Sequence, residues 1–167
     1  MMIHLQPITP VNWRQAIKLK VAPAQQEFIA SNVYSIAQSK FDEIDADGTV
    51  WRLTPLAIYA DDTMIGFAMF GLEQTQQLAG YIFSFMIDAD QQGKGHGKAA
   101  FKLLLAHMLA EAPATTRYFD ISYHPDNHVA RNLYAKFGFV ETGEIIYGEV
   151  IAKCEISRHP KTQPQLA

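Results

Sequence analysis

Apolar residues recur along the chain with two periods, which predict alternating strands and helices. Ile3 and Leu5 alternate with polar neighbours and predict a strand, after which Thr9-Pro10 predicts the start of a helix over residues 11–20. Between residues 23 and 40 the apolar positions follow helical spacing, which predicts a second helix with one buried stripe. The members of this stripe are Ile29, Val33, Ile36 and Ala37.

The middle of the chain carries strand patterns. Residues 56–60 and 64–72 predict two strands joined through Asp61-Asp62-Thr63. Residues 80–87 form an almost continuously apolar run, which is typical of a strand that is covered on both faces. We therefore expect this strand to lie in the centre of a sheet.

Helices and strands alternate again in the second half of the chain. Residues 95–112 have a helical apolar stripe that stops before Pro113, and residues 117–123 predict a strand. A further helix begins at Asn127 and ends at Gly138, a residue that commonly terminates helices. Residues 140–146 and 149–156 then predict a final hairpin. The pattern as a whole predicts an α/β protein.

The length and composition indicate one globular domain. The chain has 167 residues, of which 49% are hydrophobic, and we assign residues 1–158 to the domain and residues 159–167 to a loose tail. The net charge of −3 gives no basic surface for nucleic acid. No apolar segment approaches the length of a membrane span and no export signal is visible, so we expect a cytoplasmic protein.

The sequence predicts no metal site. The single cysteine, Cys154, excludes a cysteine-based zinc site and an internal disulfide. Glu43, Asp45 and Asp47 fall on ligand positions of a calcium loop, but its last position would be Thr54, where a bidentate glutamate is needed. The acidic stretch 42–47 could instead attract a polycation or lie in solvent as an ordinary loop.

A glycine-rich loop, Gln92-Gly93-Lys94-Gly95-His96-Gly97-Lys98, lies between the central strand and a helix. Glycines allow backbone N–H groups to converge, and a helix N-terminus adds positive potential, so this context predicts a phosphate-binding loop. Lys98 stands where the dinucleotide fingerprint needs glycine, and Ala99 stands where the magnesium-nucleotide loop needs Ser or Thr. A merely flexible turn is the alternative.

The loop resembles the coenzyme A loop of the Gcn5-related N-acetyltransferases (GNATs), whose spelling is Gln-x-x-Gly-x-Gly. Residues 127–139, from Asn127 to Phe139, resemble the Asn-x-x-Ala-x-x-Leu-Tyr-x-x-x-Gly-Phe helix of the same family. The two motifs occur in the family's order and on the expected elements. Within the family, Val21-Ala22-Pro23, residues 65–70 and residues 143–150 are most similar to bacterial spermine/spermidine acetyltransferases.

The resemblance implies a single-domain GNAT fold with a mixed, mostly antiparallel central sheet and helices on both faces. It also implies acetyl-coenzyme A as cosubstrate and a small-molecule amine as acceptor. From the composition, charge and residue spacing we expect no metal, no membrane and no nucleic acid, and a homodimer stays open. Tyr134 matches the family's general acid, although a tyrosine in that apolar stripe could also be a core residue. The implied cofactor-binding residues are Phe85, Met86, Ile87, Gln92, Gly93, Lys94, Gly95, His96, Gly97, Lys98, Asn127 and Ala130.

The acceptor and the general base stay open. Phe83-Ser84 stands where the polyamine enzymes often carry an acidic side chain, so the sequence departs from that subfamily at a position that would face the acceptor. Glu27, Glu73 and Asp88 are candidate bases, and no spacing selects one of them. A non-catalytic acyl-coenzyme A sensor and an acetyltransferase of protein amines are the alternative functions.

Overall fold

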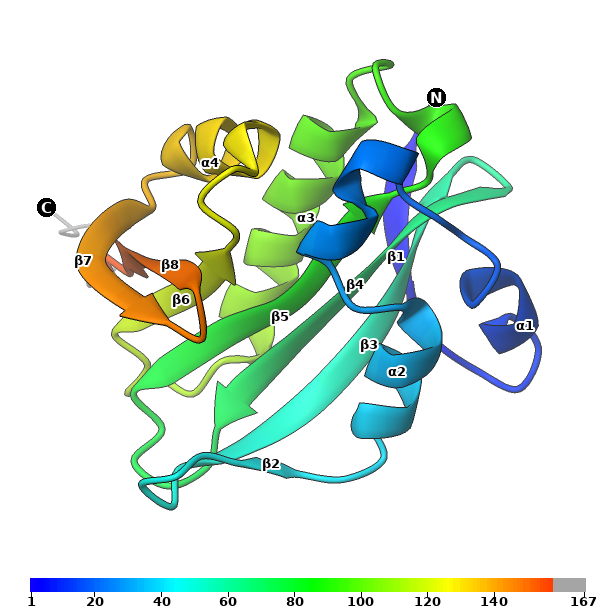
Figure 1. The fold of residues 1–167 in the computed structure, drawn as a ribbon. Coiled ribbons are helices and arrows are strands. Elements are labelled where there is room, and N and C mark those ends of the chain that lie inside the picture. Colours follow the sequence, from blue (N-terminus) through cyan, green and yellow to red (C-terminus); the bar gives the residue numbers. More distant parts are fainter. Residues whose placement is uncertain (158–167) are drawn as a thin grey trace, which may run out of the picture.

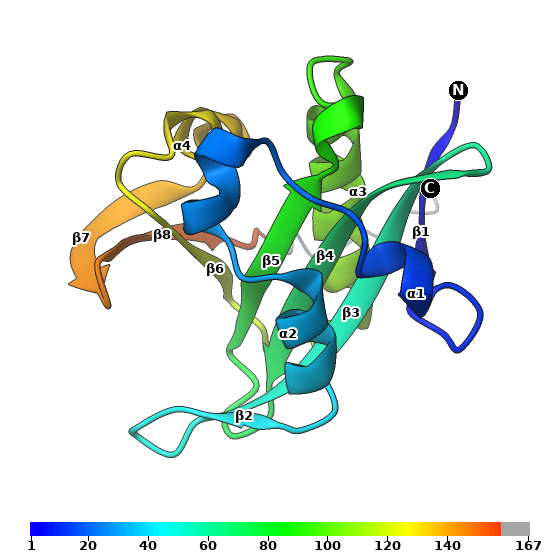
Figure 2. The ribbon, with the colours of Figure 1, turned by 45° about the vertical axis from the view of Figure 1, so that its right-hand side comes forward.

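The computed structural model describes residues 1–157, which build one open sheet with helices on both faces (Figures 1 and 2). Across the sheet the strands follow the order β1-β3-β4-β5-β6-β8-β7, and β2 pairs with β3. Only β5 and β6 run parallel among the described strand pairs, so the predicted mixed, mostly antiparallel sheet is confirmed. The strands are β1 (Ile3–Pro7), β2 (Glu43–Ile44), β3 (Val50–Ala60), β4 (Thr63–Glu73), β5 (Ala79–Ile87), β6 (Tyr118–Tyr123), β7 (Val140–Ile146) and β8 (Glu149–Glu155).

The helices lie on the two sides of this sheet, and two of them follow the predicted pattern closely. The long helix α3 and the helix α4 pack on one face, while α1 and α2 lie on the other (Figures 1 and 2). The helical elements are α1 (Trp13–Ala16), η1 (Pro23–Phe28), α2 (Asn32–Gln38), η2 (Ala89–Gln91), α3 (His96–Glu111) and α4 (His128–Ala135). The predicted tail, residues 159–167, lies outside the described residues.

The N-terminal helices differ from the prediction. The helix expected over residues 11–20 is a single short turn, and the one expected over residues 23–40 is divided into η1 and α2. The chain becomes extended at Ile29, and Ser31 then caps α2 by accepting a hydrogen bond from the Tyr34 N–H at 3.2 Å. A serine cap starts a new helix more readily than it continues an old one. Half of the predicted apolar stripe is confirmed, because Ile29 and Ile36 pack against the core beneath α1 and α2. The other half is wrong, since Val33 is 55% exposed and Ala37 is also exposed.

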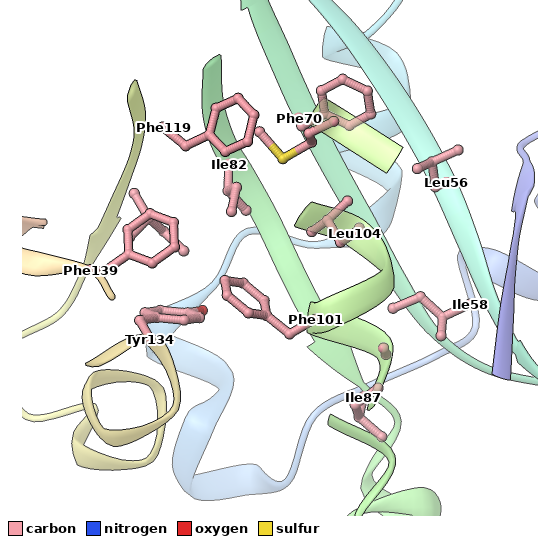
Figure 3. Close-up of a cluster of buried hydrophobic side chains, with 14 of the residues drawn as sticks. Leu56, Ile58, Phe70, Ile82, Ile87, Phe101, Leu104, Phe119, Tyr134 and Phe139 are labelled. Atoms are coloured by element: carbon pink, nitrogen blue, oxygen red, sulfur yellow. The ribbon is translucent and has the colours of Figure 1, made fainter. Parts of the chain in front are cut away.

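Two hydrophobic cores sandwich the sheet. The larger one lies beneath α3 and α4, and Phe101 stands at its centre with no exposed surface (Figure 3). The centroid of its ring lies 5.0 Å from the ring centroid of Phe85 and 5.0 Å from that of Tyr134. The second core lies beneath α1 and α2 and includes Trp51 and Phe67. Covering β5 on both sides explains why its sequence is almost continuously apolar, and the predicted central position of this strand is confirmed.

Candidate active site

Strands β5 and β6 separate part-way along their length. They pair only from Ala79↔Tyr118 to Ile82↔Ile121, although β5 continues to Ile87. Phe83 lies between Ile82 and Ser84, which pair with consecutive β4 residues, so Phe83 is the extra residue of a β-bulge. Beyond the bulge, the side of β5 that faces away from β4 has no strand partner among residues 1–157. This edge can pair with an extended ligand in the manner of an added strand.

A cavity of about 570 Å³ lies where the two strands separate. Its walls come from η1, the second half of β5, the glycine loop, the end of β6, α4 and the start of β8. Phe28 of η1 stacks on His124 after β6, with ring centroids 5.1 Å apart, and so bridges two of these walls. Eleven of the predicted site residues line the cavity, namely Phe85, Met86, Ile87, Gln92, Gly93, Gly95, His96, Gly97, Asn127, Ala130 and Tyr134.

The glycine loop closes one end of the cavity. Gly93 and Gly95 have φ angles of +74° and +81°, in the left-handed region that favours glycine, and Gly95 is the N-cap of α3. No side chain caps the N-terminus of this helix, so its first N–H groups remain available to an anion. Gln92 fixes the loop, because its side-chain amide donates to the Ile87 carbonyl at 3.0 Å and to Gln25 Oε1 at 2.8 Å.

The two lysines of the loop do not line the cavity. Lys94 donates instead to the Asp90 carbonyl at 2.8 Å and to Gln91 Oε1 at 3.1 Å, and Lys98 is exposed on the first turn of α3. His96 is buried in the cavity wall, and its Nδ1 has no hydrogen-bond partner among the described residues. The polar groups that this end offers to a ligand are therefore mainly backbone groups.

Helix α4 forms the wall opposite β5. Asn127 is its N-cap, as predicted, and its side-chain oxygen accepts a hydrogen bond from the Ala130 N–H at 3.2 Å. Tyr134 lies near the C-terminal end of the same helix and is 7% exposed. The centroid of its ring lies 5.6 Å from that of Tyr123. Tyr134 thus belongs to the core, where Figure 3 shows its ring beside that of Phe101, and it also lines the cavity. The two interpretations of this residue are compatible.

The environment of Tyr134 keeps its phenol protonated. Burial raises the pKa of Tyr134 well above its ordinary value, and the nearby side chains of Tyr123 and Glu149 raise it further. No group in residues 1–157 hydrogen-bonds its hydroxyl. A protonated phenol without a competing partner can donate its proton to an atom inside the cavity.

None of the three carboxylates predicted as candidate bases lines the cavity. Glu73 accepts hydrogen bonds from the backbone N–H groups of Gln76 and Leu78. Burial acts to raise its pKa, but these backbone donors outweigh burial and hold the pKa below its ordinary value. Asp88 accepts from the Lys20 N–H at 2.9 Å, and Glu27 is exposed on η1. Their positions indicate structural or solvent-facing roles.

The end of the cavity opposite the glycine loop contains Ser84, which the sequence singled out, and two residues that were not among the predicted site residues, Ser122 and Glu149. Ser84, on the bulge, is 4% exposed, and its Oγ has no partner among the described residues. Ser122 of β6 and Glu149 of β8 lie in the same wall, and the Ser122 hydroxyl hydrogen-bonds the Glu149 carboxylate. The sequence placed Glu149 in the final hairpin and in the segment 143–150 that resembles the polyamine enzymes, but gave it no role in the site. No periodicity in the sequence shows that β8 pairs with β6.

Asp120 on β6 is a partly buried carboxyl whose environment predicts a pH dependence of folding stability. Burial raises its pKa to about 6, Lys153 opposes this from 4.0 Å, and Glu144 adds to it. The carboxyl of an unfolded chain titrates near 4, so between pH ~4 and ~6 only the folded state keeps this proton. The free energy of unfolding should therefore fall as pH rises through that window.

We expect Asp120→Asn to remove this dependence. The free energy of unfolding of the variant should depend less on pH and should be higher by about 1 kcal/mol near neutral pH. Solvent screening of this partly exposed side chain keeps the gain that small. Urea unfolding of both proteins across the window measures it. A variant that keeps the wild-type slope would show that another group causes the dependence.

Residues 20–139 match the model of the acetyltransferase (GNAT) family, which is most of the chain. The chain belongs to the GNAT acetyltransferase family. It is also 30% identical to a spermine/spermidine N(1)-acetyltransferase of Bacillus subtilis, over 93% of this chain and 100% of that protein. As a member of this family the protein is an acetyltransferase.

Solved structures of GNAT proteins share the fold. An aminoglycoside acetyltransferase in complex with coenzyme A superposes with a TM-score of 0.70 at 16% identity, covering 92% of this chain and 95% of the other. The ribosomal-protein-S18-alanine N-acetyltransferase of Escherichia coli superposes with a TM-score of 0.65 at 16% identity, covering 97% of this chain and 99% of the other. The predicted GNAT fold class is therefore confirmed.

Residues 1–157 contain no helix that is both long and apolar enough to span a membrane. The same part of the chain has no group of three or more His, Cys, Asp or Glu side chains placed to hold a metal ion.

Proposed function

We propose that the protein transfers the acetyl group of acetyl-coenzyme A to a primary amine, and that the acceptor is a polyamine such as spermine or spermidine. One observation carries the proposal: a single cavity joins the free edge of β5, an uncapped helix N-terminus behind two left-handed glycines, and a buried tyrosine hydroxyl. Each feature suits one part of acyl transfer from a coenzyme A thioester. The cytoplasmic location, the homodimer and the domain boundary at residue 158 stay predictions.

The binding of acetyl-coenzyme A divides between two parts of the site. The backbone from Gly93 to Lys98 would hold the pyrophosphate, because the N–H groups that begin α3 have no side-chain cap. The free edge of β5 at Phe85, Met86 and Ile87 would pair with the amide groups of the pantetheine arm. Asn127 and Ala130 of α4 would border the same arm from the opposite wall.

The chemistry needs a hydrogen-bond donor for the thioester carbonyl and a proton donor for the departing thiolate. Backbone N–H groups beside Met86 and Ile87 would supply the first, at the end of the free edge. The Tyr134 hydroxyl would supply the second, since its raised pKa keeps it protonated. Both groups line one cavity, which is what acyl transfer in a single complex requires.

A polyamine acceptor is favoured by the relative and by the polar end of the cavity. The Bacillus subtilis protein with 30% identity is named for spermine and spermidine. In this chain, Glu149 supplies an acidic side chain near the position where Phe83-Ser84 lacks one, so the departure at the bulge does not leave the acceptor end without a negative charge. Acetylation of a protein amine is the second candidate within the same chemistry.

The experiment is the release of free coenzyme A thiol from acetyl-coenzyme A with a panel of amines. We expect spermine and spermidine to give at least about tenfold higher kcat/KM than a monoamine of similar length, a difference of about 1.4 kcal/mol, because the Bacillus subtilis relative is named for these two amines. Peptides with free N-termini form the comparison arm. Tight binding of acetyl-coenzyme A without thiol release for any amine would instead support a sensor.

A further inference from the structure

The acceptor end of the cavity holds one acidic side chain. Among the residues that line the cavity in the described part of the chain, Glu149 is the only carboxylate, and none is lysine or arginine. A cationic acceptor that enters this cavity therefore meets one fixed negative charge and no positive one. Coulomb attraction in a partly enclosed site is stronger than in bulk water, so this charge decides where an ammonium group rests.

The sheet fixes the position of Glu149. It is the first residue of β8, where Val150 pairs with Tyr123 and Ile151 with Ser122, so the strand is anchored directly beside β6. The Ser122 hydroxyl donates a hydrogen bond to Glu149 Oε2. No hydrogen bond to its other oxygen, Oε1, occurs among residues 1–157, which leaves that oxygen free to accept from a ligand.

Glu149 also lies close to the proton donor of the reaction. It contributes to the raised pKa of Tyr134 on one side, after burial and Tyr123. On the other side it contributes to the pKa of Tyr81, which burial first, and then Glu149, Asp120 and Asp45, raise to about 12. The Glu149 carboxylate therefore interacts electrostatically with Tyr134, which lines the same cavity, and with Tyr81.

A second group at this end also lacks a partner. Ser84 lies in the cavity wall on the bulge of β5, is 4% exposed, and has an unpaired Oγ. Buried hydroxyls are normally hydrogen-bonded, so this one indicates a polar ligand group nearby. The ring of Phe83 beside it packs 4.9 Å from that of Tyr81, and such rings suit the hydrocarbon and charge of an alkylammonium.

We propose that Glu149 is a catalytic residue, which binds the ammonium group of the acceptor and accepts its proton before acetyl transfer. This inference rests on the proposed function. A free alkyl amine has a pKa near 10.4, so only about one molecule in a thousand is uncharged at neutral pH. A carboxylate beside the ammonium can take this proton and pass it to solvent, so that the neutral nitrogen forms inside the cavity, next to the thioester.

Two protons leave the acceptor nitrogen during the reaction. The ammonium loses one proton to Glu149, which later passes it to solvent, and the neutral nitrogen attacks the thioester carbon. The C–S bond breaks as the tetrahedral intermediate collapses, and Tyr134 protonates the thiolate. The second proton lost by the nitrogen restores the Tyr134 phenol. The products are the N-acetyl amine, coenzyme A thiol and one proton in solution.

The test compares Glu149→Gln with Glu155→Gln, a matched control on the same strand whose side chain is exposed and outside the cavity. Each is assayed with spermidine and with a hydrazide, whose nitrogen is already uncharged at neutral pH. We expect Glu149→Gln to lower kcat/KM for spermidine at least about tenfold, to lower it less than about threefold for the hydrazide, and to keep the affinity for acetyl-coenzyme A. The control should match the wild type with both acceptors.

Two results would overturn the proposal. Glu149→Gln could be as active as Glu155→Gln with spermidine, or it could lose activity equally with both acceptors, which would mean that the acceptor's charge and proton are not involved. Should Glu149→Gln bind acetyl-coenzyme A poorly, Glu149→Asp, which keeps the carboxylate, must recover the preference for spermidine. A wild type that acetylates no amine would instead contradict the proposed function itself.

Discussion

Tyr134→Phe should reduce kcat by about a hundredfold or more while the affinity for acetyl-coenzyme A changes little. The substitution keeps the ring, which packs 5.0 Å from that of Phe101, and removes only the hydroxyl. That hydroxyl has no hydrogen-bond partner in the described part of the chain, so its loss leaves no buried group unsatisfied. Steady-state kinetics together with calorimetric titration of acetyl-coenzyme A measures the two quantities.

The control for this prediction is Tyr123→Phe. Tyr123 lines the same cavity, but its hydroxyl already donates to Glu141 at 2.9 Å, so it is not free to protonate a leaving group. We expect only a small change in kcat for this variant. A Tyr134→Phe enzyme with near-normal kcat, measured where chemistry limits turnover, would remove Tyr134 from the mechanism and leave solvent as the proton source.

Gly95→Asp should weaken the binding of acetyl-coenzyme A by at least about tenfold, which corresponds to ~1.4 kcal/mol. Gly95 is the N-cap of α3, and a negative charge there opposes the phosphates that the helix N-terminus would attract. A side chain also strains the backbone, since the φ angle of Gly95 is +81°. Isothermal titration calorimetry gives the dissociation constant directly.

Gly48→Asp separates strain from the effect of charge at the site. Gly48 has a φ angle of +86° and open space around it, as Gly95 has, but it lies in the turn before β3 and outside the cavity. We expect a similar loss of stability and no loss of acetyl-coenzyme A affinity. If folded Gly95→Asp binds acetyl-coenzyme A as tightly as the wild type, the pyrophosphate must bind elsewhere.

The sequence predicted the fold best where long elements pack on the sheet. Strand β5 is buried on both faces, which gives its continuous apolar run. Helix α3 is buried on one face, which gives its apolar stripe at helical spacing. The segment 11–40 was predicted poorly. Its turns are held by contacts distant in sequence, such as the Asn32 side-chain amide that donates to the Ala16 carbonyl at 2.9 Å. Helical spacing cannot reveal such contacts.

The same contrast holds in the site. The glycine loop and α4 were found because each is a contiguous motif, and Asn127 caps its helix as its position predicts. Glu149 and Ser122 reach the cavity through the pairing of β8 with β6, which joins segments on either side of α4 and depends on the order of strands in the sheet. No local pattern encodes that order, so the part of the cavity wall formed by Ser122 and Glu149 emerges only from the structure.

The most direct test of acetyl transfer to an amine is mass spectrometry of the acceptor after turnover. Wild-type protein is incubated with acetyl-coenzyme A and spermidine, and the products are quantified alongside the free thiol. The account predicts monoacetylated spermidine in equal amount to the thiol released, with both lost together in Tyr134→Phe. Thiol released without acetylated amine, or no thiol at all with spermidine, spermine, monoamines and peptides alike, would contradict it.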